Sequence, residues 1–238
     1  MSPRPTIGLL GGTFDPIHRG HLAAARAAQV ALALDRVRFI PAARPAHRAD
    51  PPLAPNAHRL EMVRRAVEEV PGWEVSDVEL RRPGPSYTID TLREMHEEGF
   101  RPTQIFFITG ADAFAEIATW HRYPEVLDAA QFVVVSRPGT SLASLRRRVP
   151  ALGERLIEPA GAGRPAGTAT PRVILVTADT PDVSSTEVRR RASRGEALDD
   201  LVPPAVAAYI AQEGLYLTSA PSARQDADAL RRTPSTGR

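Results

Sequence analysis

The chain has 238 residues, a formal net charge of +2 at pH 7 and no cysteine. This length suits one domain, or two small ones, with a substantial core, and the missing cysteine excludes disulfides, thiolate metal sites and cysteine nucleophiles. No apolar run reaches the roughly 20 residues of a membrane helix, and the first residues lack the apolar core of a signal peptide. The composition therefore predicts a cytoplasmic protein without a membrane partner.

The basic residues are all arginines, and they are spread along the chain. Only residues 146–148 and 189–191 form short basic runs. Proteins that bind extended nucleic acid more often carry one dense basic patch. The charge pattern therefore predicts that extended nucleic acid is not a partner.

Apolar β-type runs alternate with helical patterns from the N-terminus onwards. Strands are expected at residues 6–10, 37–40, 73–78, 104–109, 131–136 and 173–177, and helices at 20–34, 56–70, 87–98, 112–118, 123–129 and 203–211. This alternation predicts an α/β fold with a doubly wound, mostly parallel sheet. Ligands of such sheets bind outside the carboxyl ends of the strands, near the switch in strand order.

The irregular segments suggest how the chain is organised. Residues 42–55 are rich in proline and alanine and are expected to form a loop over a site, and residues 150–171 are expected to form an exposed loop or insertion. Residues 1–217 are expected to form one domain whose C-terminal helical lobe begins at about residue 183. The polar tail, 218–238, is expected to be disordered.

Residues 11–21, GGTFDPIHRGH, directly follow the first expected strand. Gly11 and Gly12 leave backbone N–H groups accessible, and the helix that begins shortly afterwards adds its own N–H groups and the positive end of its dipole. His18 and His21 flank that helix start and can donate hydrogen bonds to anionic oxygens. The segment therefore predicts an anion site, most naturally for a nucleotide phosphate, although it is neither a Walker loop nor a GxGxxG loop.

The same two histidines allow other interpretations. His18 and His21 could cap the helix or pack against it. A zinc site is a further alternative, although the chain has no cysteine and no HExxH pattern. The full eleven-residue string favours the anion site over both.

Two motifs resemble signatures of the nucleotidylyltransferase superfamily. His18 to His21 read HRGH, similar to its HxGH core, and residues 183–189 read VSSTEVR, similar to its ISSTxxR signature. Other stretches resemble the bacterial nicotinate-mononucleotide adenylyltransferases: PSYTIDTL at 85–92, FIP at 39–41 with His47 and Arg48, GAD at 110–112, WHR at 120–122, and the C-terminal residues 202–203, 209–210 and 215–216. The resemblance covers residues 5–217. It departs at residues 46–48, where the family usually has Pro-His-Lys, and around 159–171.

The resemblance implies a Rossmann-like fold and an enzyme that transfers the adenylyl group of ATP to nicotinate mononucleotide. The products are deamido-NAD and pyrophosphate, and Mg²⁺ accompanies ATP. The catalytic residues it implies are His18, His21 and Arg189. ATP contacts are implied for Gly12, Thr13, Phe14, His18, His21, Gly110, Asp112, Ser184, Ser185, Thr186 and Arg189, and mononucleotide contacts for Tyr87, Thr88, Trp120 and Arg48.

Several of these residues have plain structural alternatives. Trp120 could be ordinary core, Asp112 could be a helix N-cap, and Ser184 to Thr186 could form an N-cap followed by a glutamate. The remaining histidines carry less weight, and His58 and His96 are expected to be exposed on helices.

Other functions stay open on the same fold. A related adenylyltransferase could use nicotinamide mononucleotide or phosphopantetheine, and a non-catalytic nucleotide-binding regulator could retain the same residues. Backbone N–H donors near Tyr87 and Thr88 would favour a ring carboxylate over an amide, because a carboxylate only accepts hydrogen bonds. The oligomeric state is open, with a homo-oligomer among the options.

Overall fold

The structure is a computed structural model that describes residues 5–46, 50–136, 142–159, 163 and 170–217. Arg48 and the tail 218–238 lie outside the described residues, and so do the expectations for them. In the part of the chain that is described, no helix is both long and apolar enough to cross a membrane.

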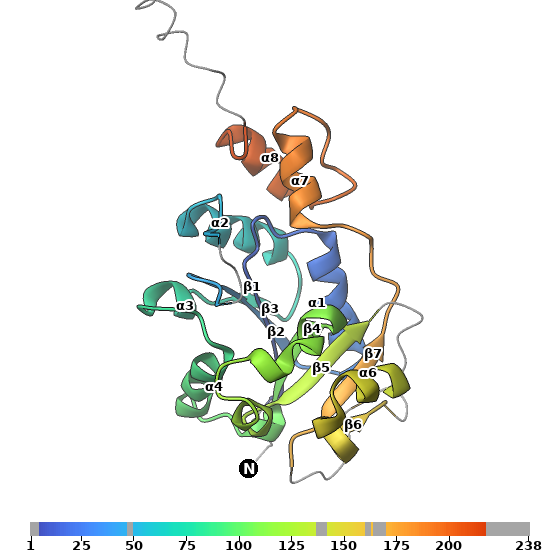
Figure 1. Cartoon of the computed structure of the whole chain (residues 1–238). Coiled ribbons are helices and arrows are strands. Elements are labelled where there is room, and N and C mark those ends of the chain that lie inside the picture. Colours follow the sequence, from blue (N-terminus) through green and yellow to red (C-terminus); the bar gives the residue numbers. More distant parts are fainter. Residues whose placement is uncertain (1–4, 47–49, 137–141, 160–162, 164–169, 218–238) are drawn as a thin grey trace, which may run out of the picture.

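Within the described residues, seven strands form one sheet at the centre of the molecule (Figure 1). They are β1 (Ile7–Gly12), β2 (Arg36–Pro41), β3 (Trp73–Val75), β4 (Ile105–Gly110), β5 (Gln131–Ser136), β6 (Leu156–Ile157) and β7 (Val173–Thr177). Their order is β3-β2-β1-β4-β5-β7-β6, and each pair of neighbours runs parallel. The predicted doubly wound α/β fold is confirmed.

The strand order reverses between β1 and β4. From β1 the chain moves outward through β2 to β3, and β4 then pairs with the other edge of β1. At such a switch point the loops after the two strands leave in opposite directions and open a crevice above their carboxyl ends. The segment 11–21 begins at this crevice.

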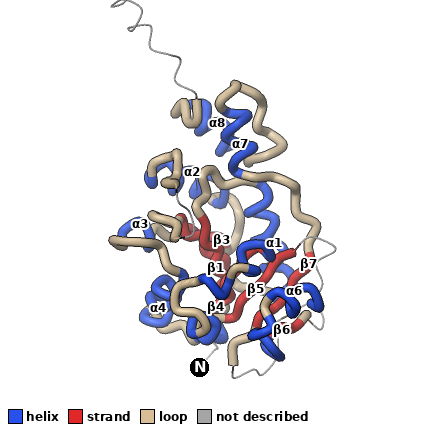
Figure 2. The backbone as a smooth tube through the Cα atoms, in the orientation of Figure 1, coloured by secondary structure: helices blue, strands red, loops and turns tan. Residues whose placement is uncertain are grey.

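Helices cover both faces of the sheet (Figure 2). They are α1 (Arg19–Leu32), α2 (Asn56–Val67), α3 (Val78–Arg81), α4 (Thr88–Glu97), α5 (Ala111–Ala115), α6 (Leu142–Arg148), α7 (Ser185–Ala192) and α8 (Pro204–Gln212). Strand alternation divides the core in two: Leu10 joins the cluster that contains α1, α2, α7 and α8, whereas Ile7 and Leu9 join the cluster that contains α4, α5 and α6.

Most expected elements lie where the sequence predicts them, and the bounds of β5 and β7 match the prediction. The strand expected at 73–78 is wrong beyond Val75: Ser76 still donates its N–H to Phe39 O on β2, but Asp77 is already the N-cap of α3. The helix expected at 112–118 ends at Ala115, and a 3₁₀ turn follows it. The helix expected at 123–129 is only a 3₁₀ turn, Glu125–Asp128.

The segment 150–171 is not entirely irregular. Leu156 and Ile157 form the short strand β6, paired with Val173 and Ile174 at the edge of the sheet. Two residues are too few for an alternating pattern, so the surrounding glycines and prolines dominate the sequence signal.

The C-terminal helices α7 and α8 lie together at one end of the molecule (Figure 1). Val188 on α7 and Val206 and Ile210 on α8 are buried in the same cluster as the apolar residues of α1 and α2. Helices α7 and α8 are therefore packed against α1 and α2.

Candidate active site

Two cavities meet at the switch point. The larger, of about 800 Å³, is bordered by His18, His21 and the residues just after β4. The smaller, of about 280 Å³, lies towards β2 and the start of α4. Gly11, Thr109 and Ala113 line both cavities, so a molecule in one can reach a molecule in the other.

His18 and His21 stack in the larger cavity, with ring centroids 3.7 Å apart. The backbone N–H of His18 donates to Nδ1 of His21 at 3.2 Å. Because Nδ1 accepts this bond, the proton of the neutral His21 ring is on Nε2. Nδ1 of His18 is buried and has no hydrogen-bond partner within the described chain. The pair thus combines a capping contact, one of the alternatives, with unused hydrogen-bonding capacity.

Both histidines are held in their neutral form. Burial lowers the pKa of His18 from its usual value of 6.5 to about 4. Burial, and then the neighbouring His18, lowers the pKa of His21 well below 6.5. Each ring therefore enters the cavity at pH 7 as a neutral donor, and an anion placed there would raise both pKa values.

Gly20 gives the HRGH motif its tight geometry. A Cβ at this position would lie 3.1 Å from Nδ1 and Cε1 of His18, and 3.5 Å from Pro181 O. A side chain would therefore push the His18 ring or the segment that carries Pro181. Glycine at this position lets the ring lie against the first turn of α1.

The second signature lies across the same loop. Ser184 is the N-cap of α7 and accepts the N–H of Glu187 at 3.2 Å, so the capping alternative is confirmed. Ser185 Oγ donates to Pro16 O at 2.9 Å. Arg189 donates through Nη1 to Asp15 O at 2.6 Å and through Nη2 to Thr186 Oγ1 at 3.1 Å. Helix α7 is thereby attached to the loop between β1 and α1.

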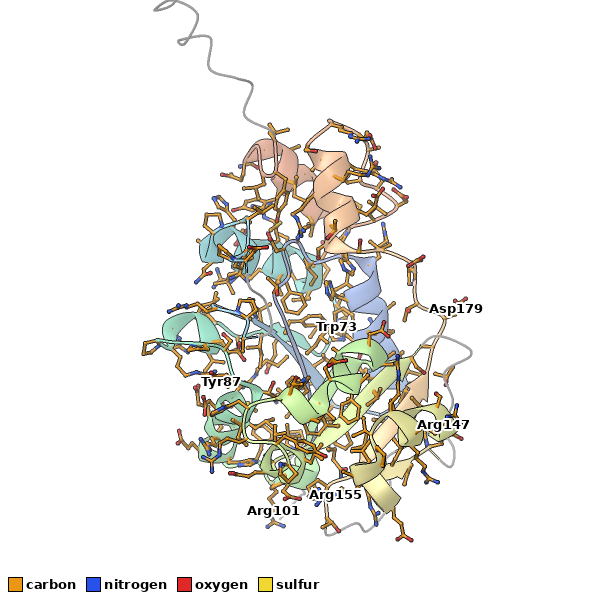
Figure 3. The ribbon with its side chains drawn as sticks, in the orientation of Figure 1. Trp73, Tyr87, Arg101, Arg147, Arg155 and Asp179 are labelled. Atoms are coloured by element: carbon orange, nitrogen blue, oxygen red, sulfur yellow. The ribbon has the colours of Figure 1, made fainter. Side chains whose placement is uncertain are left out.

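Gly110 and Asp112 lie on the opposite wall of the larger cavity. Gly110 is the N-cap of α5, and Asp112 is exposed in its first turn. The alternative that Asp112 is the N-cap is therefore wrong, and the residue lines the cavity. Residues 180–183 complete the wall on the way from β7 to α7, and Figure 3 labels Asp179 on this segment.

Aromatic rings line the smaller cavity. Phe107 and Trp120 meet edge-on, with centroids 5.9 Å apart, and Trp120 also packs on Phe132 at 6.2 Å. Trp120 is half-buried, so it belongs partly to the core and partly to the cavity wall. Tyr87, labelled in Figure 3, stacks on His121 at 4.1 Å.

The N-terminus of α4 is directed at the smaller cavity. Tyr87 is its N-cap and Thr88 its first residue, and both line the cavity. The first backbone N–H groups of a helix have no partner within the helix and favour an anion. The donors expected near Tyr87 and Thr88 would be the first backbone N–H groups of α4.

The remaining expected ATP residues, on the loop after β1, do not line the larger cavity. Gly12 and Thr13 line the smaller cavity. Phe14 has a buried side chain that meets the His21 ring edge-on, with centroids 5.0 Å apart. Phe14 therefore packs against His21 from the buried core.

Sequence reasoning missed four residues at the site. Arg59 is fully buried and donates to Thr13 O, Ala42 O and Asn56 Oδ1, which fixes the loop after β1. The signal for it was present, because residue 59 falls in helical register with the buried residues 62, 63 and 66. The other three are Asp15 and Glu79, both buried, and His121.

The structure corrects the expectation for two other histidines. His58 Nδ1 lies 2.9 Å from the hydroxyl of Tyr209, and His96 Nε2 lies 2.9 Å from Ala129 O. Both rings are half-buried rather than exposed. Each ring joins its helix to a neighbouring segment. A polar residue within a helical sequence pattern gives no indication of such a contact.

Carboxylates and histidines do not assemble into a metal centre in the described part of the chain: no group of three or more could hold an ion there. Asp112 and Asp182 are the acidic residues that line the larger cavity. These residues fit a metal ion that arrives on a phosphate group better than a resident one.

Comparisons with known proteins agree with this geometry. The cytidylyltransferase-like family matches residues 9–191. A Roseiflexus sp. protein named "Probable nicotinate-nucleotide adenylyltransferase" is 45% identical over 218 residues, which are 91% of this chain and 100% of that protein. The Thermus thermophilus protein of the same name is 43% identical over 210 residues, 88% of this chain and 98% of that one.

Solved structures extend the likeness to the fold. Plasmodium falciparum nicotinic acid mononucleotide adenylyltransferase complexed with NaAD superposes with a TM-score of 0.67 at 18% identity, covering 90% of this chain and 98% of that one. At this identity the structural likeness concerns the fold, whereas the family follows from the matches in sequence. The chain belongs to the nicotinate-nucleotide adenylyltransferase family, within the cytidylyltransferase-like proteins.

Proposed function

We propose that this protein is a nucleotidyltransferase that transfers the adenylyl group of ATP to nicotinate mononucleotide, forming deamido-NAD and pyrophosphate for NAD biosynthesis. The observation that carries the proposal is the pair of cavities that share Gly11, Thr109 and Ala113. One cavity has the donors expected for phosphates, and the other has aromatic walls and a helix N-terminus. A reaction that joins two nucleotides needs this adjacency.

The chemistry requires no general base. A phosphate oxygen of the mononucleotide, already ionised at pH 7, attacks the α-phosphorus of ATP. The bond from that phosphorus to the bridging oxygen of the β-phosphate breaks, and pyrophosphate leaves with the electron pair. Positioning and stabilisation of the developing charge then account for the catalysis.

We assign the ATP side to the larger cavity. Neutral His18 and His21 donate to the phosphate oxygens, and Arg189 binds the leaving pyrophosphate. Further ATP contacts come from Gly12, Thr13 and Phe14 on the first loop, Gly110 and Asp112 after β4, and Ser184, Ser185 and Thr186 at the start of α7. We assign Asp112 the role of accepting a hydrogen bond from a ribose hydroxyl.

We assign the pyridine ring to the smaller cavity. Trp120 provides a flat apolar surface for the ring. The N–H groups at Tyr87 and Thr88 donate to the ring carboxylate, which favours nicotinate over nicotinamide. Arg48 is proposed as a phosphate contact on the resemblance alone, since it lies outside the described residues.

Mg²⁺ enters as part of the ATP substrate, held mainly by phosphate oxygens and water. The requirement for ATP supports a cytoplasmic location. Residues 1–217 are proposed to act as one domain, and the shared core of α1, α2, α7 and α8 supports this.

The test is a pyrophosphate-release assay with Mg²⁺ and ATP, in which nicotinate mononucleotide, nicotinamide mononucleotide and phosphopantetheine are offered separately. We expect release with the nicotinate form and, for the other two, kcat/KM values lower by about a hundredfold or more, because an unmatched polar group would be buried at α4.

Two other outcomes would contradict the proposal. Preferred turnover of another acceptor would retain the chemistry and overturn the roles of Tyr87, Thr88 and Trp120. Binding of ATP without turnover of any acceptor would favour the regulatory alternative.

A further inference from the structure

A buried carboxylate, Asp15, lies directly behind the phosphate site. Its side chain is 2% exposed, although the residue belongs to the loop between β1 and α1. Oδ2 accepts the N–H of Leu53 at 2.8 Å, and Oδ1 accepts the N–H of Ala54 at 3.1 Å. The mechanism proposed above uses Asp15 for no contact with substrate.

The C-terminal end of the described chain reaches the same carboxylate. The hydroxyl of Tyr216 donates to Oδ1 of Asp15 at 2.9 Å, and burial raises the pKa of Tyr216, so that it is a neutral donor. The two residues are far apart in sequence. A tyrosine beyond the last helix is thereby connected to the loop that carries the first signature.

Arg189 is oriented by the same residue. Nη1 of Arg189 donates to the backbone oxygen of Asp15 and lies 4.0 Å from its Oδ2. Nη2 donates to Thr186, and the arginine side chain is 18% exposed. Since a guanidinium has five N–H donors, these contacts fix its plane and leave other donors for an anion.

We propose that Asp15 is a positioning residue that holds Arg189 for the pyrophosphate group, and that Tyr216 acts on the site through Asp15. Asp15 touches neither substrate. It balances the charge of Arg189 in a buried setting and fixes where the guanidinium points. Tyr216 and the N–H groups of Leu53 and Ala54 hold the carboxylate in turn. The inference rests on the proposed function only in taking Arg189 as the pyrophosphate contact.

The chain offers a matched control for Tyr216. Tyr209, on α8 in the same C-terminal lobe, also makes a side-chain hydrogen bond of 2.9 Å through its hydroxyl, but its partner is His58 on α2. Tyr216→Phe and Tyr209→Phe each remove one such bond. A purely structural role would make the two variants alike.

The experiment measures pyrophosphate binding to the free protein by calorimetry, together with KM for ATP and kcat. We expect Tyr216→Phe to weaken pyrophosphate binding by about three- to tenfold, as the loss of one hydrogen bond at a positioning residue would. KM for ATP should rise by a similar factor and more than KM for the mononucleotide. Tyr209→Phe should keep pyrophosphate binding within about twofold of wild type. Its Tm should fall by about as much as that of Tyr216→Phe, because each variant loses one hydrogen bond.

Asp15→Asn should have a larger effect, about tenfold or more, since it removes the charge that faces Arg189. If Arg189→Lys is added, the two effects should not be additive, because both changes disrupt one contact. If Asp15→Asn does not fold, Tyr216→Phe decides alone. Pyrophosphate binding by Tyr216→Phe equal to that of Tyr209→Phe would overturn the proposal.

The two proposals fail separately. Wild-type protein that binds pyrophosphate in a Tyr216-dependent way, but does not turn over nicotinate mononucleotide, would refute the function and support the positioning role. Wild-type turnover of nicotinate mononucleotide, together with unchanged pyrophosphate binding by Tyr216→Phe, would support the function and refute the positioning role.

Discussion

The two cavities are built in different ways. In the larger, His18 and His21 lie at the start of α1, and the loop behind them is held by Asp15 and Arg59. The smaller is formed by short segments around Ala42, Tyr87 and Trp120, joined by a few hydrogen bonds such as that from Ala43 N–H to Ser86 Oγ at 3.0 Å. A rigid phosphate site beside a loop-built acceptor site lets the same chemistry be combined with different acceptors.

The largest effect on activity should come from a substitution in the larger cavity. His18→Ala removes a donor aimed at the phosphates, and we expect kcat to fall by about a thousandfold, the range seen when a preorganised donor is lost. Pyrophosphate release and a thermal melt would be measured on the same preparation. His58 lines neither cavity, so His58→Ala is the control and should retain kcat. Equal turnover of His18→Ala and wild type would refute the catalytic role.

A change in the smaller cavity should alter the KM for nicotinate mononucleotide. Trp120→Ala should raise KM for nicotinate mononucleotide by about ten- to a hundredfold, as expected when a stacking surface is lost, and leave KM for ATP nearly unchanged. The other tryptophan of the chain, Trp73, packs on Phe39 with centroids 5.0 Å apart and is the matched control. A Trp120 variant that affects the two substrates equally would mean that the cavities are not separate.

The two cavities also differ in how far the sequence predicts them. The larger depends on contiguous motifs, so HRGH and SST could be placed at once on a helix start and a helix cap. Its supporting contacts could not be placed: Asp15 meets Leu53, Arg189 and Tyr216, and no periodicity relates these positions. They come together only because α7 and the C-terminal end fold back on the first loop.

The central strands were easier to predict than the strands at the edges of the sheet. Buried parallel strands such as β5 are continuous apolar runs and can be read directly. The two-residue strand β6 and the early end of β3 depend on pairing with neighbours, which single segments do not encode. In the smaller cavity, His121 belongs to the WHR stretch at 120–122, but its stacking on Tyr87 could not be predicted from that stretch.

A substitution of Gly20 tests whether activity depends on the position of the His18 ring in the larger cavity. Gly20→Ala places a Cβ about 3.1 Å from the His18 ring, and we expect kcat to fall by about tenfold. Alanine is the better helix former by roughly 1 kcal/mol, so Tm should hold or rise although activity falls. Steady-state kinetics and calorimetry on the one variant give both readouts. A fall in Tm with unchanged kcat would contradict the geometry.

The smallest effect concerns stability and pH. His18 titrates near pH 4 in the folded state and near 6.5 when unfolded, and the pKa of His21 is also lowered, so the unfolded chain binds more protons between these values. Stability is therefore highest above pH 6.5 and falls towards pH 4, by about 1.4 kcal/mol per pH unit for each histidine. Urea unfolding at pH 7.5, 6 and 5 would measure this slope. His18→Gln should reduce it by one histidine's share, whereas a slope identical to wild type would mean that the pKa of His18 is the same in the folded and the unfolded protein. In that case His18 would gain a proton near pH 6.5 in the folded protein as well, and the larger cavity would present a cation to the phosphates only below that pH.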